Sequence, residues 1–377
     1  RRGYGRWRVL VDGVAQRRQP ANPAAVVPFP VSFKDDAALI AKLPKAELHL
    51  HLEGSIEPET AVELAAGHGV ALTREEVAAR YQYKDFLGFI EAFKWVTSLL
   101  RTPADYALIT DRLAETLLRQ NVIYAEVTLS VGVMLWRKQD AEANFIAICE
   151  AGDRARAKGL RLQWIFDCVR QFGPEAAMEV ARLAVRMKDE GVVAFGMGGD
   201  ELSRSVEDFR AVYDHAAEQG LHRVVHAGEI GGPEEVQDAI EILGAERVGH
   251  GIGVAREERT MELVAERGVT LEVCPTSNLR TGALAKQLGR ANASVEDHPL
   301  PKLVRRGLRI TLGTDDPAMF GCTLNGEYAL ALRLGLSAAE VARVAECGVA
   351  AAFLPSREKA TLLNLFRADV KAQGLVY

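Results

Sequence analysis

Short β-branched or aliphatic segments alternate with longer amphipathic segments along most of this 377-residue chain. This alternation favours parallel strands joined by crossover helices, because each crossover must return the chain to the same end of the sheet. Eight such strands over about 300 residues indicate a (β/α)8 TIM barrel of the α/β class. The strands are expected at residues 46–51, 122–128, 161–167, 192–197, 222–226, 247–250, 269–274 and 308–313.

Amphipathic helices are expected between these strands, for example at residues 174–190, 234–243 and 257–267, where apolar residues recur at helical spacing. The gap from 52 to 121 is too long for one crossover, so the barrel should carry extra helices between its first and second strands. One of them, at 85–100, is rich in Phe and Leu and is expected chiefly to pack in the core. A doubly wound sheet is the competing fold, but no G-x-G-x-x-G motif follows the first strand.

Two segments differ in charge and composition. Residues 1–34 are expected to form a short basic N-terminal arm with a Pro-rich linker, and residues 35–377 the barrel. Six Arg and one Asp lie in residues 1–18, so the rest of the chain carries 40 Lys and Arg against 50 Asp and Glu. Because phosphate neutralisation needs clustered cations, the acidic body argues against nucleic acid as the main partner. We expect the arm to be solvated; contact with RNA or lipid is the alternative.

The five cysteines are odd in number, widely spaced and without a C-x-x-C pair, which is typical of reduced thiols. No apolar run of signal-peptide or membrane-span type follows the basic start. The chain is therefore expected to be cytoplasmic, without a membrane partner. Its oligomeric state is not indicated by the sequence.

Histidines and acidic residues recur at the expected C-terminal ends of the strands, where TIM barrels carry their catalytic groups. Three imidazoles and a carboxylate suit Zn²⁺, which lowers the pKa of a bound water toward neutrality. The residues at these strand ends are His49, His51, His226, His250, Asp315 and Asp316.

The spacing of these residues suggests individual roles. His49 and His51 are two residues apart, so both point to the same face of a strand. Glu229 follows His226 by three residues and can face a substrate without binding the metal; burial would raise its pKa and let it donate a proton at neutral pH. A surface Glu229 capping the next helix is the alternative. For His250, the spacing leaves open a fourth ligand, a core histidine or a base that holds the water.

Six motifs occur in order from about Leu43 to the mid-300s. Together they resemble the successive signatures of the adenosine deaminase family, which belongs to the amidohydrolase superfamily of metal-dependent barrels. The motifs are His49-Leu-His-Leu-Glu-Gly54, Gly198-Gly-Asp-Glu201, His226-Ala-Gly-Glu229, Arg247-Val-Gly-His-Gly251, Cys274-Pro-Thr-Ser-Asn278 and Thr314-Asp-Asp-Pro317.

The resemblance implies a catalytic centre with one Zn²⁺ per chain. It implies that Glu229 protonates purine N1 while a metal-bound hydroxide, oriented by His250 and Asp316, attacks C6 and ammonia leaves. A second metal is not expected, because residues 192–199 contain no Lys of the kind that bridges two metals in related barrels. The implied metal ligands are His49, His51, His226 and Asp315; the implied substrate contacts are His51, Glu53, Gly199 at N3 and Asp316 at N7.

The expected function is zinc-dependent hydrolytic deamination of a small 6-aminopurine nucleoside, of the adenosine-to-inosine type. Glu53 stands where adenosine deaminases that hold the ribose 5′-hydroxyl usually have Asp, and H-x-H-L-E-G is more similar to the adenine deaminase branch. A third substrate is 6-aminodeoxyfutalosine of menaquinone biosynthesis, whose 5′ position carries a benzoate-bearing extension. Arg280 or Arg137-Lys138 could pair with that carboxylate; a solvated basic loop is the alternative.

Three other functions were compared with this one. Amide or ester hydrolysis at the same centre disagrees with Glu229 and the Asp315-Asp316 pair, which have purine-specific roles in the family. An inactive barrel acting as a binding protein should lack a metal ligand or the proton donor, and none is missing. Zinc enzymes of the cytidine deaminase type need H-x-E and P-C-x-x-C, which Cys274-Pro275 does not match.

Overall fold

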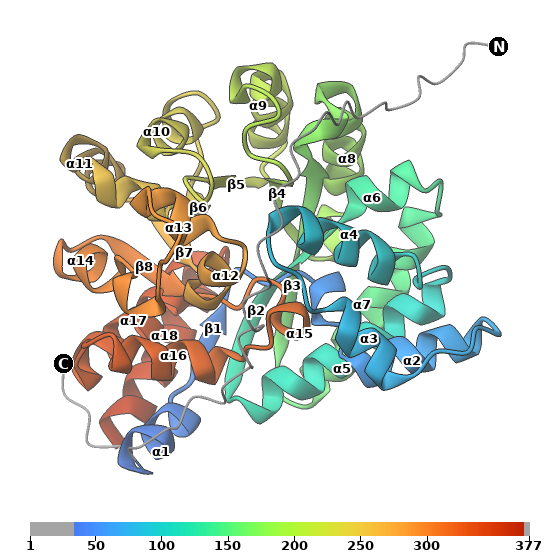
Figure 1. The fold of residues 1–377 in the computed structure, drawn as a ribbon, viewed down its shortest axis with the longest axis horizontal. Coiled ribbons are helices and arrows are strands. Elements are labelled where there is room, and N and C mark those ends of the chain that lie inside the picture. The colour runs from blue at the N-terminus through green and yellow to red at the C-terminus, as the bar shows by residue number, and fades with distance from the viewer. Residues whose placement is uncertain (1–33, 373–377) are drawn as a thin grey trace, which may run out of the picture.

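The computed structural model describes residues 34–372 and contains an eight-stranded parallel sheet whose strands follow one another in chain order (Figure 1). The sheet closes where Leu50 and Asp315 form a parallel bridge. At this seam the amide of His51 donates to the Asp315 carbonyl at 2.8 Å, and the amide of Asp315 donates to the His49 carbonyl at 3.0 Å. The (β/α)8 barrel is therefore confirmed. Its strands are β1 (Lys45–Glu47), β2 (Val122–Leu129), β3 (Arg161–Val169), β4 (Val192–Gly198), β5 (His222–Ala227), β6 (Arg247–His250), β7 (Thr270–Val273) and β8 (Arg309–Leu312).

Helices surround the sheet (Figure 1). The extra helices predicted between the first two strands are α2 (Pro58–Gly67), α3 (Arg74–Arg80), α4 (Phe86–Thr97) and α5 (Pro103–Arg119). The other α-helices are α1 (Lys34–Lys42), α6 (Val131–Trp136), α7 (Ala141–Ala157), α8 (Pro174–Arg186), α9 (Arg210–Glu218), α10 (Pro233–Glu241), α11 (Glu258–Arg267), α12 (Pro275–Arg280), α13 (Ala283–Leu288), α14 (Leu300–Arg305), α15 (Pro317–Phe320), α16 (Leu324–Arg333), α17 (Ala338–Ala351) and α18 (Ser356–Ala372).

Local sequence explains where several of these helices begin. α5 starts with a capping box, in which the Thr102 hydroxyl accepts from the Asp105 amide and the Asp105 carboxylate accepts from the Thr102 amide at 2.8 Å. Pro103 at the first helical position fits because its missing N–H would have no partner there. Ser337 and Glu340 form the same box at the start of α17. These caps satisfy backbone donors that the helix itself leaves unpaired.

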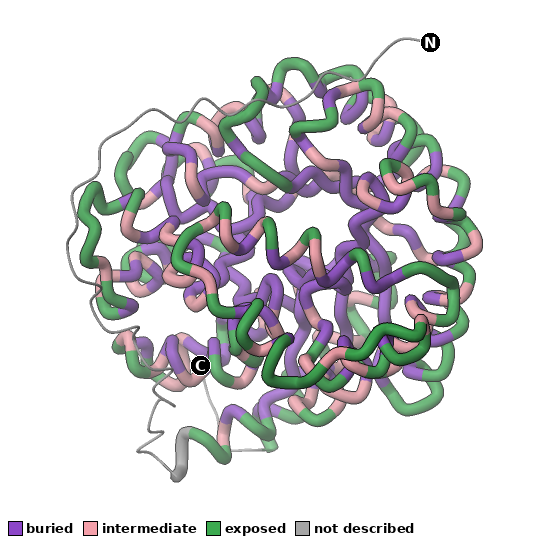
Figure 2. Tube along the Cα trace, turned by 45° about the vertical axis from the view of Figure 1, so that its right-hand side comes forward, coloured by how far each residue is buried: buried purple, intermediate pink, exposed green. Residues whose placement is uncertain are grey.

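Buried residues run through the strands and the inner helix faces, and exposed residues cover the outer helix faces (Figure 2). Both faces of the strands are covered, so most strand residues are buried rather than alternating with exposed ones. Along α4, Phe89 and Val96 are buried while Phe86 and Phe93 are partly buried against the core, which agrees with the packing role expected for 85–100.

The first strand differs from its prediction. It was expected at 46–51 but ends at Glu47, because the segment from Leu48 onward leaves the regular ladder. Only isolated bridges, at Leu50 and at His51 with Thr128, continue the pairing. The segment remains fully buried, so the apolar pattern that suggested a longer strand reflects burial at the seam.

Three expectations concern the remainder of the chain. The basic arm expected at residues 1–34 lies, except for Lys34, outside the described residues. All five cysteines are free thiols. Within residues 34–372 no helix is both long and apolar enough to cross a membrane.

Candidate active site

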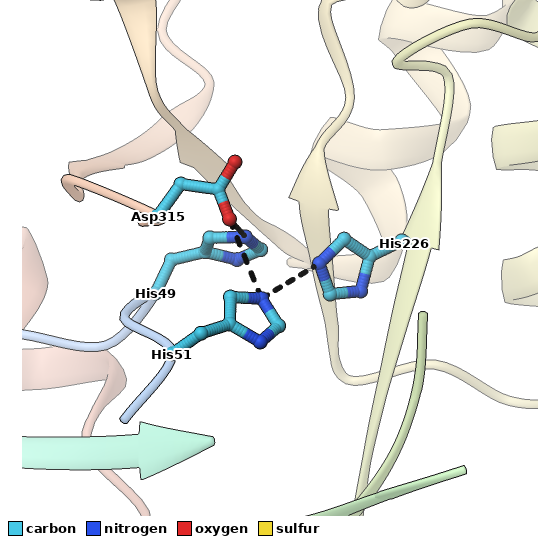
Figure 3. Close-up of side chains that lie close together, drawn as sticks. All are labelled: His49, His51, His226 and Asp315. Carbon is cyan, nitrogen blue, oxygen red and sulfur yellow. Dashed lines mark hydrogen bonds and ion pairs between the residues drawn. The ribbon is translucent and has the colours of Figure 1, made fainter. Parts of the chain in front are cut away.

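The four predicted metal ligands come together in the structure, His49, His51 and Asp315 from the closing seam of the barrel and His226 from β5 (Figure 3). His49, His51, His226 and Asp315 each offer one ligand atom, and these atoms lie within 4.8 Å of one another. His51 Nε2 is 3.3 Å from His226 Nε2 and 3.4 Å from Asp315 Oδ1, and His49 Nε2 is 3.6 Å from the same oxygen. Four ligands at tetrahedral positions about 2.0–2.1 Å from Zn²⁺ would be about 3.3 Å apart. The observed spacing fits such an ion.

The hydrogen bonding of the histidine rings in the cluster also fits a metal. His226 Nδ1 donates to the Met197 carbonyl at 3.0 Å, which leaves the Nε2 lone pair directed at the cluster. His49 Nε2 is buried and has no hydrogen-bond partner. Burial lowers the pKa of His51 to about 4 and, with the neighbouring imidazoles, lowers the pKa of His226 well below its usual value. The nearby carboxylates of Asp315 and Glu272 outweigh burial and raise the pKa of His49 to about 10. Because metals bind the neutral imidazole, an ion held here would displace the proton of His49.

A buried chain of charges lies behind His49. His49 Nδ1 donates to Glu272 Oε2 at 2.8 Å, and Arg247 Nε lies 2.6 Å from Glu272 Oε1. Arg247 in turn pairs with Glu126 at 2.5 Å, and Glu126 accepts from the Tyr124 hydroxyl at 2.7 Å. All of these side chains are at most 3% exposed. The chain holds His49 with Nε2 toward the cluster, because a carboxylate at Nδ1 selects that tautomer.

Replacing Glu272 with Gln should therefore weaken zinc binding by about 10- to 100-fold, which is the usual effect of losing such a partner. The measurement is transfer of Zn²⁺ from the protein to a chromophoric chelator. Glu246→Gln is the matched control, since Glu246 also accepts from a histidine, His222 at 2.7 Å, but at a partly exposed site near the start of β5. Equal zinc affinity in both variants would show that Glu272 does not position His49.

Glu229 is buried beside the cluster, so the alternative of an exposed helix cap is wrong. Its Oε2 lies 3.6 Å from His250 Nε2, and its Oε1 accepts from the Thr281 hydroxyl at 3.2 Å. Burial, reinforced by the charges of Asp315 and Glu201, raises the pKa of Glu229 to about 8. A carboxyl group with this pKa holds a proton at neutral pH and is suited to act as a general acid.

Glu201 supports the loop that carries Glu229. Its carboxylate accepts from the amides of Gly228, Ile230 and Gly231, the last two at 2.8 Å. Gly228 has a φ of 68°, and a Cβ there would collide with Val236. The Gly198-Gly-Asp-Glu201 motif thus acts on the site through the loop that follows β5, in addition to the contact that the resemblance implies for Gly199.

His250 ends β6 with a φ of 61° and does not belong to the four-residue cluster. Its Nε2 faces Glu229 and lies 3.9 Å from Asp315 Oδ2, and its Nδ1 is 3.0 Å from the amide nitrogen of Asn278. Burial lowers the pKa of His250 to about 3. A neutral imidazole held between Asp315 and Glu229 is suited to orient a water molecule near the metal position.

Asp316 is also buried, and its Oδ1 has no hydrogen-bond partner. The backbone of Gly54 touches this carboxylate so closely that any Cβ at Gly54 would overlap Asp316 Oδ1. An unsatisfied buried oxygen is costly unless a ligand pairs with it. The position therefore agrees with the predicted contact to a substrate or its attacking water.

Glu53 and Gly199 are held by neighbouring side chains. Glu53 is buried; its two carboxylate oxygens accept from the amide and the hydroxyl of Ser130, at 3.0 and 3.2 Å. Gly199 has a φ of 101°, and Gln171 Oε1 occupies the space that a Cβ would need. Burial raises the pKa of Glu53 to about 7.

The basic residues considered for a substrate carboxylate have different surroundings. Arg137 donates to the Lys94 carbonyl at 2.8 Å and to the Thr97 hydroxyl at 3.0 Å, so it caps the end of α4. Arg280 lies over the ring of Tyr83, 5.6 Å from the ring centre. Neither guanidinium is the isolated surface charge of a solvated loop.

Several residues of the site were not predicted from the sequence. Glu272, Glu126 and Asp167 are acidic residues within short apolar strand segments, and this was the signal that they point into the barrel. Asp167 is 5% exposed, with Oδ1 unpartnered. Ser277 lies in the Cys274-Pro-Thr-Ser-Asn278 motif, but no role was predicted for it or for Thr281, because hydroxyl residues are common after a strand. In the structure Ser277 donates to Asp315 at 2.7 Å.

Comparisons with known proteins agree with this geometry. Residues 44–368 match the model of the family described as adenosine deaminase. Aminodeoxyfutalosine deaminase of Streptomyces coelicolor is 42% identical over 338 residues, covering 88% of this chain and 85% of that protein. Adenine deaminase of Rhizobium leguminosarum bv. trifolii is 33% identical over 323 residues, covering 85% and 98%.

The crystal structure of adenine deaminase from Arthrobacter aurescens superimposes with a TM-score of 0.81 at 28% sequence identity, covering 87% of this chain and 99% of that one. Members of the matched family are metal-dependent hydrolases, and the chain has a cluster that fits a metal. The family match, the relatives and the cluster all lead to the same conclusion: the chain is a C–N-bond hydrolase of the deaminase type and belongs to the adenosine deaminase family.

Proposed function

We propose that this protein is a zinc-dependent deaminase of 6-aminodeoxyfutalosine. The observation that carries the deaminase chemistry is a buried Glu229 beside three histidines and Asp315, where burial raises the pKa of its carboxyl group to about 8. An acid and a metal site next to each other can supply a proton and a polarised water molecule to neighbouring atoms of one substrate.

The surroundings of Glu53 support this substrate over adenosine. Each carboxylate oxygen of Glu53 already accepts a hydrogen bond from Ser130, and the side chain is 1% exposed. Because the Glu53 carboxylate is turned toward Ser130 and is almost fully buried, little of it is open to a free 5′-hydroxyl. The 5′ position of 6-aminodeoxyfutalosine carries an extension instead of a hydroxyl. The 42% identical relative from Streptomyces coelicolor is named for the same substrate.

In the proposed mechanism His49, His51, His226 and Asp315 hold one Zn²⁺. When bound, the ion supplies a water molecule whose pKa is lowered toward neutrality. His250 and Asp316 orient that water toward C6 of the purine. Glu229 would donate its proton to N1 as the water oxygen adds to C6, with His250 or Asp316 taking one proton of the water. The second proton of the water would then pass to the C6 amino group, the C6–N bond would break to release ammonia, and the first proton would return to Glu229. The Gly199 amide hydrogen-bonds N3 and Asp316 pairs with N7, which fix the ring.

The enzyme loaded with Zn²⁺ should deaminate 6-aminodeoxyfutalosine with a kcat/KM at least about 100-fold above that for adenosine or adenine, because both lack the aryl extension and so lose binding energy in the transition state. The measurement is the loss of absorbance that accompanies the change from 6-aminopurine to 6-oxopurine, with the three substrates in parallel. A preference for adenosine would contradict this proposal.

Adenine deamination is the second candidate, favoured by the 33% identical relative and the Arthrobacter aurescens structure, both named for it. Adenine also lacks a 5′-hydroxyl, so the surroundings of Glu53 do not distinguish it from 6-aminodeoxyfutalosine. A preference for adenine in the same assay would support this candidate.

A further inference from the structure

Two exposed aromatic side chains stack on each other in the segments that follow β2 and β3. Trp136 ends α6, which follows β2, and Phe172 ends the short 3-10 helix (Arg170–Phe172) that follows β3. Their ring centres are 5.8 Å apart with an interplanar angle of 26°. Trp136 is 65% exposed and Phe172 is 37% exposed, and within residues 34–372 no other Phe, Trp or Tyr is exposed. Exposing this much aromatic surface is unfavourable unless something covers it.

Both elements that carry this pair also contact the substrate side of the site. Ser130, at the start of α6, holds Glu53 through its amide and hydroxyl. Gln171, directly before Phe172, packs on Gly199. The two segments that carry the pair therefore also hold Glu53 and Gly199, the residues for which the resemblance implies contacts with the sugar and purine N3.

A cationic side chain, that of Arg204, lies against the residue that follows Phe172. The Arg204 guanidinium packs against Gly173, the residue after Phe172, so that a Cβ on Gly173 would be 3.5 Å from its Cζ. Among the described residues it has no hydrogen-bond or ion-pair partner. By contrast, the Arg170 guanidinium nearby is fully engaged with the carbonyls of Glu201 and His226.

We propose that Trp136 and Phe172 bind the aromatic ring of an aryl-carboxylate extension on the substrate and that Arg204 pairs with its carboxylate. This subsite deepens the proposed function and rests on it. An aryl group gains stacking on a preformed aromatic pair, and a guanidinium presents two donors to a carboxylate. The charge and the apolar surface together match an aryl carboxylate better than a sugar phosphate, which would leave the Trp136 ring uncovered.

The test compares three substrates: 6-aminodeoxyfutalosine, its analogue without the ring carboxylate, and 5′-deoxyadenosine, which lacks the extension. The preference for an aryl substrate is measured as its kcat/KM divided by the kcat/KM for 5′-deoxyadenosine. Trp136→Ala should lower this preference by about 10-fold for both aryl substrates. Arg204→Met should lower the ratio for the carboxylated substrate over its uncarboxylated analogue by about 10-fold. Both effects should appear in KM more than in kcat, since neither residue touches the reacting atoms.

The matched controls are Ile146→Ala on α7 and Arg182→Met on α8, which remove an exposed apolar and an exposed cationic side chain elsewhere and should change no ratio. Ratios in the Trp136 and Arg204 variants equal to those of the controls would overturn the subsite. So would an equal loss for all three substrates with a change in molar mass by light scattering, which would mean that the pair covers an interface between copies of the chain.

Failure of the proposed function has a different outcome. A wild-type enzyme that turns over 5′-deoxyadenosine or adenine but not the two aryl substrates contradicts the proposed substrate, and the subsite with it. A wild-type enzyme that prefers the aryl substrates, with variants that keep this preference, contradicts the subsite alone.

Discussion

Glu229→Gln should lose about 10²- to 10⁴-fold in kcat while it keeps its metal, because the amide has nearly the same shape as the carboxyl group but no acidic proton to donate. Glu229 is not part of the ligand cluster, and its carboxyl contacts are with Thr281 and His250. The measurement pairs turnover of the preferred substrate with zinc content of the purified protein. Glu234→Gln, at the exposed start of α10, is the matched control.

Unchanged turnover in Glu229→Gln would mean that another group protonates the substrate. The pH profile gives an independent check. Because burial raises the pKa of Glu229 to about 8, the group holds its proton below that pH and loses it above. Activity that needs the protonated form should therefore fall as the pH rises through about 8, and the variant should lack this limb of the profile.

Asp315→Ala should bind little or no zinc and have no measurable turnover. The substitution removes the only carboxylate of the cluster, and with it the negative charge that offsets part of the charge of a divalent ion. It also removes the acceptor of the Ser277 hydroxyl. Loss of one of four protein ligands from a site of this type lowers metal affinity by several orders of magnitude, well beyond the effect expected for Glu272→Gln.

Metal content measured after purification and again after dialysis against a defined zinc concentration provides the test. Asp214→Ala, at an exposed acidic residue on α9, is the control and should retain full zinc. Full occupancy in Asp315→Ala, with a thermal unfolding midpoint like that of the wild type, would contradict the assignment of Asp315 as the fourth ligand.

The strands were predictable because parallel barrel strands are buried on both faces and therefore read as short apolar segments between amphipathic helices. Seven of the predicted strands agree with the structure to within two residues at each end. The first ended four residues earlier than predicted. Burial alone could not distinguish a hydrogen-bonded strand from the buried, irregular segment that carries His49 and His51.

That histidines and acidic residues gather at one end of the barrel was predictable for a similar reason, whereas the choice of His49, His51, His226 and Asp315 as the ligands came from the resemblance. All parallel strands of a barrel end at the same face, so histidines and acidic residues at strand ends must lie near one another. This conclusion needs no information on contacts between distant parts of the chain. The charged side chains behind the cluster were not predictable in this way. Glu272 and Arg247 are charged residues in apolar segments, and nothing local shows that one partner of Glu272 is His49, 223 residues earlier in the chain.

The sequence by itself determined the order of the strands, the set of groups at their ends and, through the motifs, the class of reaction. Only the tertiary structure decided how these groups are used. Closing the barrel at Leu50 and Asp315 brings residues from opposite ends of the chain within 4 Å and so creates the cluster. Burial raises the pKa of Glu229, and the amide and hydroxyl of Ser130 hold the carboxylate of Glu53 in place. Desolvation and contact distance depend on all surrounding elements at once, and no local pattern encodes them.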